Sequence, residues 1–283
     1  MSSLVWQTSR FLIDLKRPQV MGIVNLTPDS FSDGGQNASL SQALEHAQTL
    51  LAQGADILDI GGESSRPGAA PVILSDELKR ILPFLKEAVH WGVPISIDTY
   101  KPEVMQVALD LGADIINDIW ALRQPGALQV IASHPSCGVC LMHMHREPLS
   151  MQAQPMEGDA LTHVRHFLAT QIKTALATGI APARLMLDPG IGFGKNDAQN
   201  ISLLKRQIEL RELGYPLLAG WSRKGSLARI TAVRGVQPDA THRTGASVAA
   251  ALVAVQNGAS VVRVHDVMET VQALKLWAEI EKP

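Results

Sequence analysis

The stretch Met21-Gly-Ile-Val-Asn-Leu-Thr-Pro-Asp-Ser-Phe-Ser-Asp-Gly-Gly35 joins a short apolar segment to a loop rich in polar and turn-forming residues. Residues 20–24 are apolar and partly β-branched, as expected of a strand covered on both faces. Carboxylates and an amide follow, and such oxygen ligands suit a hard cation such as Mg2+. A solvated turn with an Asx cap is the alternative interpretation. The polar residues are Asn25, Thr27, Asp29, Ser30, Ser32 and Asp33.

A similar unit recurs along the chain, in which a helical segment ends in glycine and a short apolar strand finishes in polar residues. The clearest copies are Gly54-Ala-Asp-Ile-Leu-Asp-Ile60, Gly112-Ala-Asp-Ile-Ile116 and Gly258-Ala-Ser-Val-Val262. With the first strand and the looser copies the chain has eight predicted strands, and helical periodicity lies between them. The looser copies span residues 92–98, 138–142, 185–188 and 215–220.

Eight strands that alternate with helices predict an α/β fold, a (β/α)8 TIM barrel, with a doubly wound sheet as the alternative. A barrel of this kind typically needs about 250 residues, so the 283 residues predict a single domain, residues 1–283. Residues 1–18 are expected to form a short hairpin across the bottom of the barrel. The active site of such a barrel lies at the carboxyl ends of the strands.

The composition excludes several classes of partner. Apolar residues make up 46% and charged residues 18%, and the net charge of −2 provides no field for nucleic acid or a membrane surface. The sequence has no apolar run of membrane-spanning length and no signal peptide at its start, so we expect a cytoplasmic protein. Cys137 and Cys140, with His143 and His145 nearby, suggest a zinc or redox site. Positions three apart on a strand face opposite sides, which disfavours that site.

Polar side chains end the predicted strands and should converge on one cup. Carboxylates and amides deep in an apolar barrel can hydrogen-bond the donor-rich edge of a flat heterocycle, so a base-like ligand is predicted. The residues that end the strands are Asn25, Glu63, Asp98, Asn117, His143, Asp188, Ser222, Lys224, Arg263 and His265.

Positive charge gathers at the same end, on Arg66, Lys224, Arg263 and His265. Arginine forks match phosphate oxygens, and the last two loops of these barrels commonly hold phosphate, so we expect an anion there. Solvated side chains or structural ion pairs are the alternative.

The glycine-rich segment Asp188-Pro-Gly-Ile-Gly-Phe-Gly-Lys195 lacks the spacing of a P-loop and of a dinucleotide fingerprint. Its glycines are expected to let the backbone pass under a planar ligand, with Phe193 beside that ligand. A purely structural turn is an equally good interpretation of this segment.

Together these motifs resemble dihydropteroate synthase, the folate-pathway enzyme family of bacteria. The resemblance spans residues 20–266 in the family's order. It rests on the opening stretch 21–35 and on Gly61-Gly-Glu-Ser-Ser-Arg-Pro-Gly68, Ile97-Asp-Thr99, Ile116-Asn-Asp-Ile119, Leu141-Met-His-Met144, Leu187-Asp-Pro-Gly-Ile-Gly-Phe-Gly-Lys195, Ser222-Arg-Lys224 and Arg263-Val-His-Asp266.

The resemblance implies condensation of p-aminobenzoate with 6-hydroxymethyl-7,8-dihydropterin diphosphate, with Mg2+ as cofactor and a homodimer as assembly. It assigns catalysis to Asp98, Lys224, Asn25 and Arg66. The pterin set is Asp98, Asn117, Asp188, Lys224, Met142 and Phe193. The diphosphate set is Asn25, Arg66, Arg263 and His265, with Asn25 and Asp33 near Mg2+. The p-aminobenzoate set is Phe31, Ser65, Pro67, Phe193, Ser222 and Lys224.

The chain departs from the family's usual residues at Ser65, Tyr100 and Gly225, within or beside the p-aminobenzoate set, so sulfonamide affinity is in doubt more than activity. Two other functions are alternatives. A pterin-binding methyltransferase domain would share the barrel, but the Ser-Arg-Pro and Ser-Arg-Lys loops disfavour it. A non-catalytic pterin-binding protein is disfavoured by the intact cationic cluster.

Overall fold

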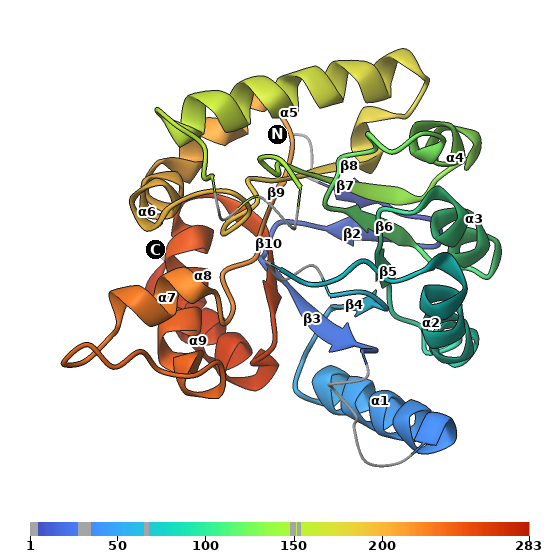
Figure 1. Cartoon of the computed structure of the whole chain (residues 1–283), viewed down its shortest axis with the longest axis horizontal. Helices are drawn as coiled ribbons and strands as arrows, with labels where there is room; N and C mark the ends of the chain where they lie inside the picture. Colours follow the sequence, from blue (N-terminus) through green and yellow to red (C-terminus); the bar gives the residue numbers. More distant parts are fainter. Residues whose placement is uncertain (1–4, 28–34, 65–67, 148–150, 152–153, 283) are drawn as a thin grey trace.

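Eight parallel strands close into a barrel, with helices around them (Figure 1). The computed structural model describes residues 5–27, 35–64, 68–147, 151 and 154–282, and for residues 35–39 the backbone alone. The strand order is β10-β3-β4-β5-β6-β7-β8-β9, and pairing of the last strand with β3 closes the ring, with Arg263 opposite Met21. This closure confirms the predicted (β/α)8 barrel over a doubly wound sheet, which would leave two open edges.

The barrel strands are short, as is usual for this fold. They are β3 (Gln19–Asn25), β4 (Ile57–Gly61), β5 (Ile95–Asp98), β6 (Ile115–Asp118), β7 (Gly138–Met142), β8 (Leu185–Asp188), β9 (Leu217–Ala219) and β10 (Ala259–Val264).

The α-helices of the described chain follow these strands. They are α1 (Gly35–Ala52), α2 (Leu74–Ala88), α3 (Pro102–Asp110), α4 (Ala127–Ser133), α5 (Ala160–Ala177), α6 (Asp197–Arg206), α7 (Gly225–Ile230), α8 (Thr244–Gln256) and α9 (Val267–Ile280). Helix α6 ends at Arg206, and a 3-10 helix, η3 (Gln207–Leu213), continues it.

Strand alternation divides the core into two parts. Inward-facing side chains fill the lower barrel with one apolar cluster, which includes Met21, Ile57, Ile115, Cys140, Met186, Leu218 and Val261. Their neighbours along each strand face outward and pack against the helices in a second, larger cluster. A small antiparallel sheet of β1 (Val5–Gln7) and β2 (Leu12–Asp14) adds buried Trp6 and Ile13 to the inner cluster.

The two cysteines follow the same alternation. Cys140 belongs to the inner cluster and Cys137 to the outer one, so the predicted opposite orientation is confirmed. Both thiols are free and buried, and burial raises the pKa of each thiol, which disfavours a thiolate ligand.

None of the helices within the described ranges combines the length and apolar character needed to cross a bilayer.

The repeated Gly-Ala-Asp sequence has a structural role at the amino ends of the strands. The carboxylate of Asp56 accepts the backbone N–H of Val20 at 2.8 Å, and that of Asp114 accepts the N–H of Ile95 at 2.9 Å. Asp114 is fully buried and also binds the guanidinium of Arg10 at 2.6 Å. Each aspartate therefore anchors the start of a neighbouring strand.

Replacing Asp114 by alanine is expected to lower the free energy of unfolding by about 2–4 kcal/mol, because a buried amide and a guanidinium lose their acceptor. Urea denaturation measures this loss. Asp56→Ala is the matched control, and we expect a loss of about 1 kcal/mol, because its Arg17 partner is largely exposed. Equal losses in the two variants would contradict this assignment.

Candidate active site

A polar layer lies directly above the apolar layer inside the barrel. Asp59, Asn117, Asp188 and Arg263 occupy inward positions two residues beyond members of the apolar cluster, on β4, β6, β8 and β10. Asp98, on β5, lies level with Asn117. Arg263 Nε donates to Asp59 Oδ2 at 2.5 Å, and Nη2 donates to Asp98 Oδ2 at 2.7 Å. The side chain of Asn117 donates to the same Asp59 oxygen at 3.2 Å. Four of the residues therefore form one hydrogen-bonded cluster.

Asp59 was not among the predicted site residues, because that prediction used only the polar residues that end each strand. It is fully buried in the middle of β4, between outward-facing Leu58 and Ile60. Within the described part of the chain its Oδ1 atom has no hydrogen-bond partner. A carboxylate inside an otherwise apolar strand was the available signal, since burial of an unpaired charge is costly.

The cluster holds charge in a place where water is scarce. Burial raises the pKa of Asp98 to about 7, although Arg263 acts in the opposite direction. Burial lowers the pKa of Arg263, but Asp59 and Asp98 outweigh that effect and raise it above its usual value. Arg263 therefore stays a cation, and a ligand that reaches this layer meets a fixed positive charge between two carboxyl groups.

Lys224, Phe193 and Asp188 form a second group of residues beside this cluster. Lys224 lies with its Nζ 4.3 Å from the ring centre of Phe193, which belongs to an apolar cluster with Met142 and Ile119. Asp188 Oδ1 accepts the backbone N–H of Gly190 at 2.6 Å, and burial raises the Asp188 pKa. The site thus combines an apolar wall with hydrogen-bond acceptors, and this combination suits a flat ligand with polar edges.

Ser222 and His265 follow the last two strands, β9 and β10, and bind each other. Ser222 Oγ lies 2.9 Å from His265 Nδ1 and accepts the His265 backbone N–H at 3.1 Å. Arg223 between the loops pairs with Asp266 at 2.6 Å, so its guanidinium supports the loops.

His143 differs from the expectation that every strand-ending polar residue faces the cup. Met142 faces inward, so the next residue turns outward, and the His143 ring lies edge-on to Phe167 of α5 at 5.0 Å. Its Nδ1 atom lies 2.9 Å from Lys195 Nζ. Burial and the nearby lysine lower its pKa to about 2, so His143 is a neutral structural residue.

Several predicted residues lie outside the described part of the chain: Phe31, Asp33, Ser65, Arg66 and Pro67. Of the predicted metal ligands, Asn25 is described, at the half-buried end of β3 beside Gly61. The described ranges contain no group of three or more His, Cys, Asp or Glu side chains that could hold a metal by themselves. One amide oxygen fits an Mg2+ ion that takes most of its ligands from substrate phosphate and water.

A cavity of about 240 Å3 opens beside the polar layer, at the ends of β4, β5 and β6. Asp98 lines it together with Tyr100 and Trp120, whose rings lie 6.3 Å apart. Tyr100 donates to Glu63 Oε1 at 3.0 Å, and Lys101 pairs with Glu63 and with buried Glu77. Tyr100, one of the departures from the family pattern, therefore shapes the wall next to the loop after β4.

The comparisons with known proteins agree with this geometry. The model of the family described as "Pterin binding enzyme" matches residues 21–265. A dihydropteroate synthase of Neisseria meningitidis serogroup C is 50% identical over 98% of both chains. A Xanthomonas albilineans dihydropteroate synthase solved with 4-aminobenzoic acid superimposes with a TM-score of 0.92 at 45% identity, over 100% of both chains. A Burkholderia cenocepacia dihydropteroate synthase solved with 7,8-dihydropteroate has a TM-score of 0.88 at 44% identity, covering 98% of this chain and 96% of the other.

This chain belongs to the dihydropteroate synthase family. Among the synthase, the methyltransferase domain and the non-catalytic pterin-binding protein, the named relatives favour the synthase. They are similar over nearly the whole chain, so the family name applies to the barrel and its loops together.

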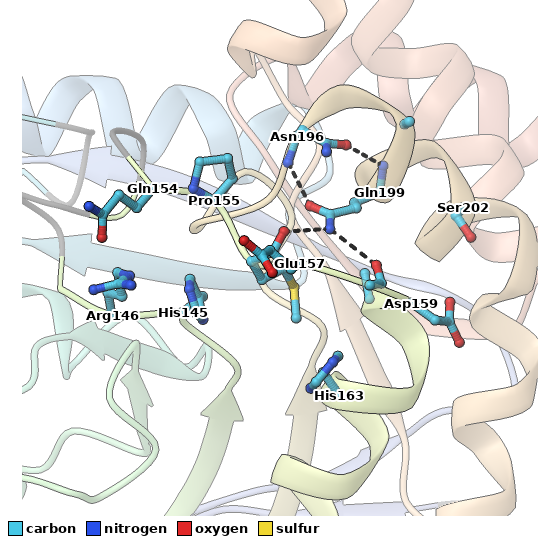
Figure 2. A pocket seen from close by; sticks show the side chains of 14 residues that line it. His145, Arg146, Gln154, Pro155, Glu157, Asp159, His163, Asn196, Gln199 and Ser202 are labelled. Carbon is cyan, nitrogen blue, oxygen red and sulfur yellow. Dashed lines mark hydrogen bonds between the residues drawn. The ribbon is translucent and has the colours of Figure 1, made fainter.

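A second, larger cavity of about 1480 Å3 lies beside the synthase barrel's mouth, between the loop after β7 and the first turn of α6 (Figure 2). Asn196 and Gln199 form a capping box at its edge, with both hydrogen bonds at 2.9 Å (Figure 2). The Gln199 side chain also donates to Met156 O at 2.7 Å. These bonds join the loop after β7 to α6, which carries the glycine-rich segment on its amino end.

The ionisation of Lys224 predicts the pH dependence of pterin binding. Burial lowers the pKa of its ammonium to about 8, although Asp188 opposes the shift. A base is charged below its pKa, so the affinity that depends on this charge should be present below pH 8 and lost as the pH rises through it. Calorimetric pterin titrations from about pH 6.5 to 9.5 measure this. Lys224→Arg, which stays charged, should lack the alkaline loss; an unchanged profile would contradict the assignment.

Proposed function

We propose that this site joins p-aminobenzoate to 6-hydroxymethyl-7,8-dihydropterin diphosphate, with 7,8-dihydropteroate and diphosphate as products. The chain is an enzyme, a transferase of the dihydropteroate synthase type. The observation that carries the proposal is the buried cluster of Arg263 with Asp59, Asp98 and Asn117 at the carboxyl ends of the strands. It presents acceptors for the donor-rich edge of a pterin within an apolar barrel.

We assign pterin recognition to residues on strands β4 to β8 and on the loops that follow β8 and β9. Asp98, Asn117 and Asp188 supply the polar contacts, and Asp59 joins them because its buried Oδ1 has no hydrogen-bond partner among the described residues. Lys224 adds a positive charge beside Asp188. Met142 and Phe193 form the apolar wall against the ring faces.

The chemistry assigned to this chain is mainly electrostatic. The bond between the substrate's methylene carbon and the diphosphate oxygen breaks, the amine nitrogen of p-aminobenzoate bonds to that carbon, and the amine loses a proton. The ring carries positive charge as the leaving group departs, and an ionised Asp98 beside it stabilises that charge. Direct displacement by the amine, with less charge on the ring, is the alternative.

We assign the diphosphate to Asn25, Arg66, Arg263 and His265, and a Mg2+ ion to Asn25 and Asp33. Such an ion would neutralise the charge of the diphosphate, while Asn25 orients it from the end of β3. Arg263 binds two carboxylates in the described structure, so it would act on the anion mainly through its charge.

We assign p-aminobenzoate to the space bounded by Phe193, Ser222 and Lys224 on one side. Phe31, Ser65 and Pro67 are assigned to the same substrate from the sequence. The Lys224 ammonium near the Phe193 ring supports this assignment, because it could also meet the carboxylate of the second substrate.

We further propose that the whole chain is one domain, that it forms a homodimer through its outer helices and that it works in the cytoplasm. Leu276 and Ile280 lie one turn apart on α9 and are 65% and 69% exposed, which suits burial against a second copy. The free thiols of Cys137 and Cys140 suit a reducing compartment.

Turnover of the two substrates with release of diphosphate tests the proposed reaction, and Asp98→Asn tests the mechanism. The amide keeps the shape of the side chain but loses the negative charge, so kcat/KM should fall about tenfold to a thousandfold, or about 1–4 kcal/mol. Circular dichroism confirms that the variant is folded. Near-normal kinetics in a folded variant would contradict the role of Asp98.

Replacing His265 by alanine should weaken the binding of inorganic diphosphate by about 1.5–3 kcal/mol and leave the binding of a phosphate-free pterin nearly unchanged. Calorimetry with both ligands measures this difference. Ser222→Ala is the control, because it removes the bond to the imidazole but keeps the imidazole itself. Equal losses for both ligands in His265→Ala would show that this residue does not hold the anion.

A further inference from the structure

Lys195, the last residue of the glycine-rich segment, is a buried basic residue outside the sets of residues assigned above, and burial lowers the pKa of its side chain to about 7. Its side chain is 1% exposed. Its Nζ atom donates to Gly190 O at 2.8 Å, to Phe193 O at 3.1 Å and to His143 O at 3.3 Å, and lies 2.9 Å from His143 Nδ1. An ammonium has three hydrogens, and four acceptors surround this one. Lys195 therefore has no hydrogen left for a ligand.

We propose that Lys195 is a positioning residue of the pterin site, because its ammonium fastens the glycine-rich loop 190–194 to the end of β7. The inference rests on the proposed function, since it concerns how that pterin site is held in shape.

The loop cannot hold this position by regular secondary structure. Gly190, Gly192 and Gly194 have φ values of +67°, +81° and +71°, in the left-handed region that favours glycine. A Cβ atom on Gly190 would lie 1.9 Å from His143 O, so the loop runs directly against the end of β7. Carbonyls in such a loop need a donor, and the Lys195 ammonium provides it.

The outer side of the loop is held by α6. The buried side chain of Asn200 accepts the Gly192 backbone N–H at 2.9 Å and donates to Lys195 O at 3.2 Å. The same amide donates to Ser226 Oγ on α7 at 3.0 Å. Lys195 therefore holds the loop against the end of β7, and Asn200 holds it against α6.

The groups that this loop places are those assigned to the pterin. Phe193 lies on the loop, with Lys224 Nζ 4.3 Å from its ring, and the Gly190 N–H binds the carboxylate of Asp188. A shift of the loop would move the apolar wall and a polar contact together. The diphosphate residues Asn25 and Arg263 lie on β3 and β10, not on the loop or on β7, so binding of that anion should not depend on Lys195.

Lys195→Met keeps the length of the side chain and removes its donors. We expect binding of 6-hydroxymethyl-7,8-dihydropterin to weaken about tenfold or more, with binding of inorganic diphosphate and Mg2+ retained within about twofold. Calorimetry with each ligand measures this below the melting temperature of the variant. A general loss of structure would weaken both ligands, so the selectivity separates positioning from stability.

Arg184→Met is the matched control. Arg184 is 2% exposed and donates to Cys137 O and Ile131 O, both at 2.7 Å, so it too is a buried basic residue that binds backbone carbonyls. It lies at the amino ends of the strands, next to the start of β8. This variant should lose stability and keep both affinities within about twofold.

If Lys195→Met fails to fold, Asn200→Ala removes the outer support of the loop without disturbing a buried charge. It should also weaken the pterin selectively, by about threefold or more. Folded variants of either kind that bind the pterin like the parent protein, or that lose both ligands equally, would overturn the role of Lys195. Failure of the parent protein itself to bind the pterin would instead contradict the proposed function.

Discussion

The burial of Arg263 between Asp59 and Asp98 is the interaction on which the rest of the site depends. A lone cation or carboxylate at this depth would be strongly destabilised, and each becomes tolerable because its partners are present. The three residues come from β10, β4 and β5, so their contact requires a closed barrel in the correct register. The ion pairs therefore link the chemistry to the closure of the sheet.

Along the barrel axis, the residues that stabilise the fold and the residues of the site occupy different layers. Its lower interior is apolar, from Met21 to Val261, and gains from the hydrophobic effect. The layer above it, with Asp59, Asp98 and Asn117, is polar and costs stability unless its groups are paired. The apolar layer thus provides a rigid base on which a few polar groups are held at fixed positions for a ligand.

Three basic side chains inside the barrel, of which Arg263 is partly exposed, have different tasks at different levels along the barrel axis. Arg184 binds carbonyls near the amino ends of the strands, and Arg263 balances carboxylates in the middle of the mouth. Lys195 binds carbonyls of the loop above β8. A residue type alone does not reveal which task a basic side chain has, because the task depends on the acceptors that the fold brings to it.

The sequence by itself determined the period of the strands and helices, and therefore the barrel, the strand ends and the positions of Asp98, Asn117 and Asp188. Local periodicity suffices for these, because side-chain direction alternates along a strand. Only the tertiary structure decided that Asp59 joins the site, that His143 faces the helices and that Arg263 binds residues 204 and 165 positions away in the chain. Those outcomes depend on register between distant strands and on the packing of loops, which local sequence does not encode.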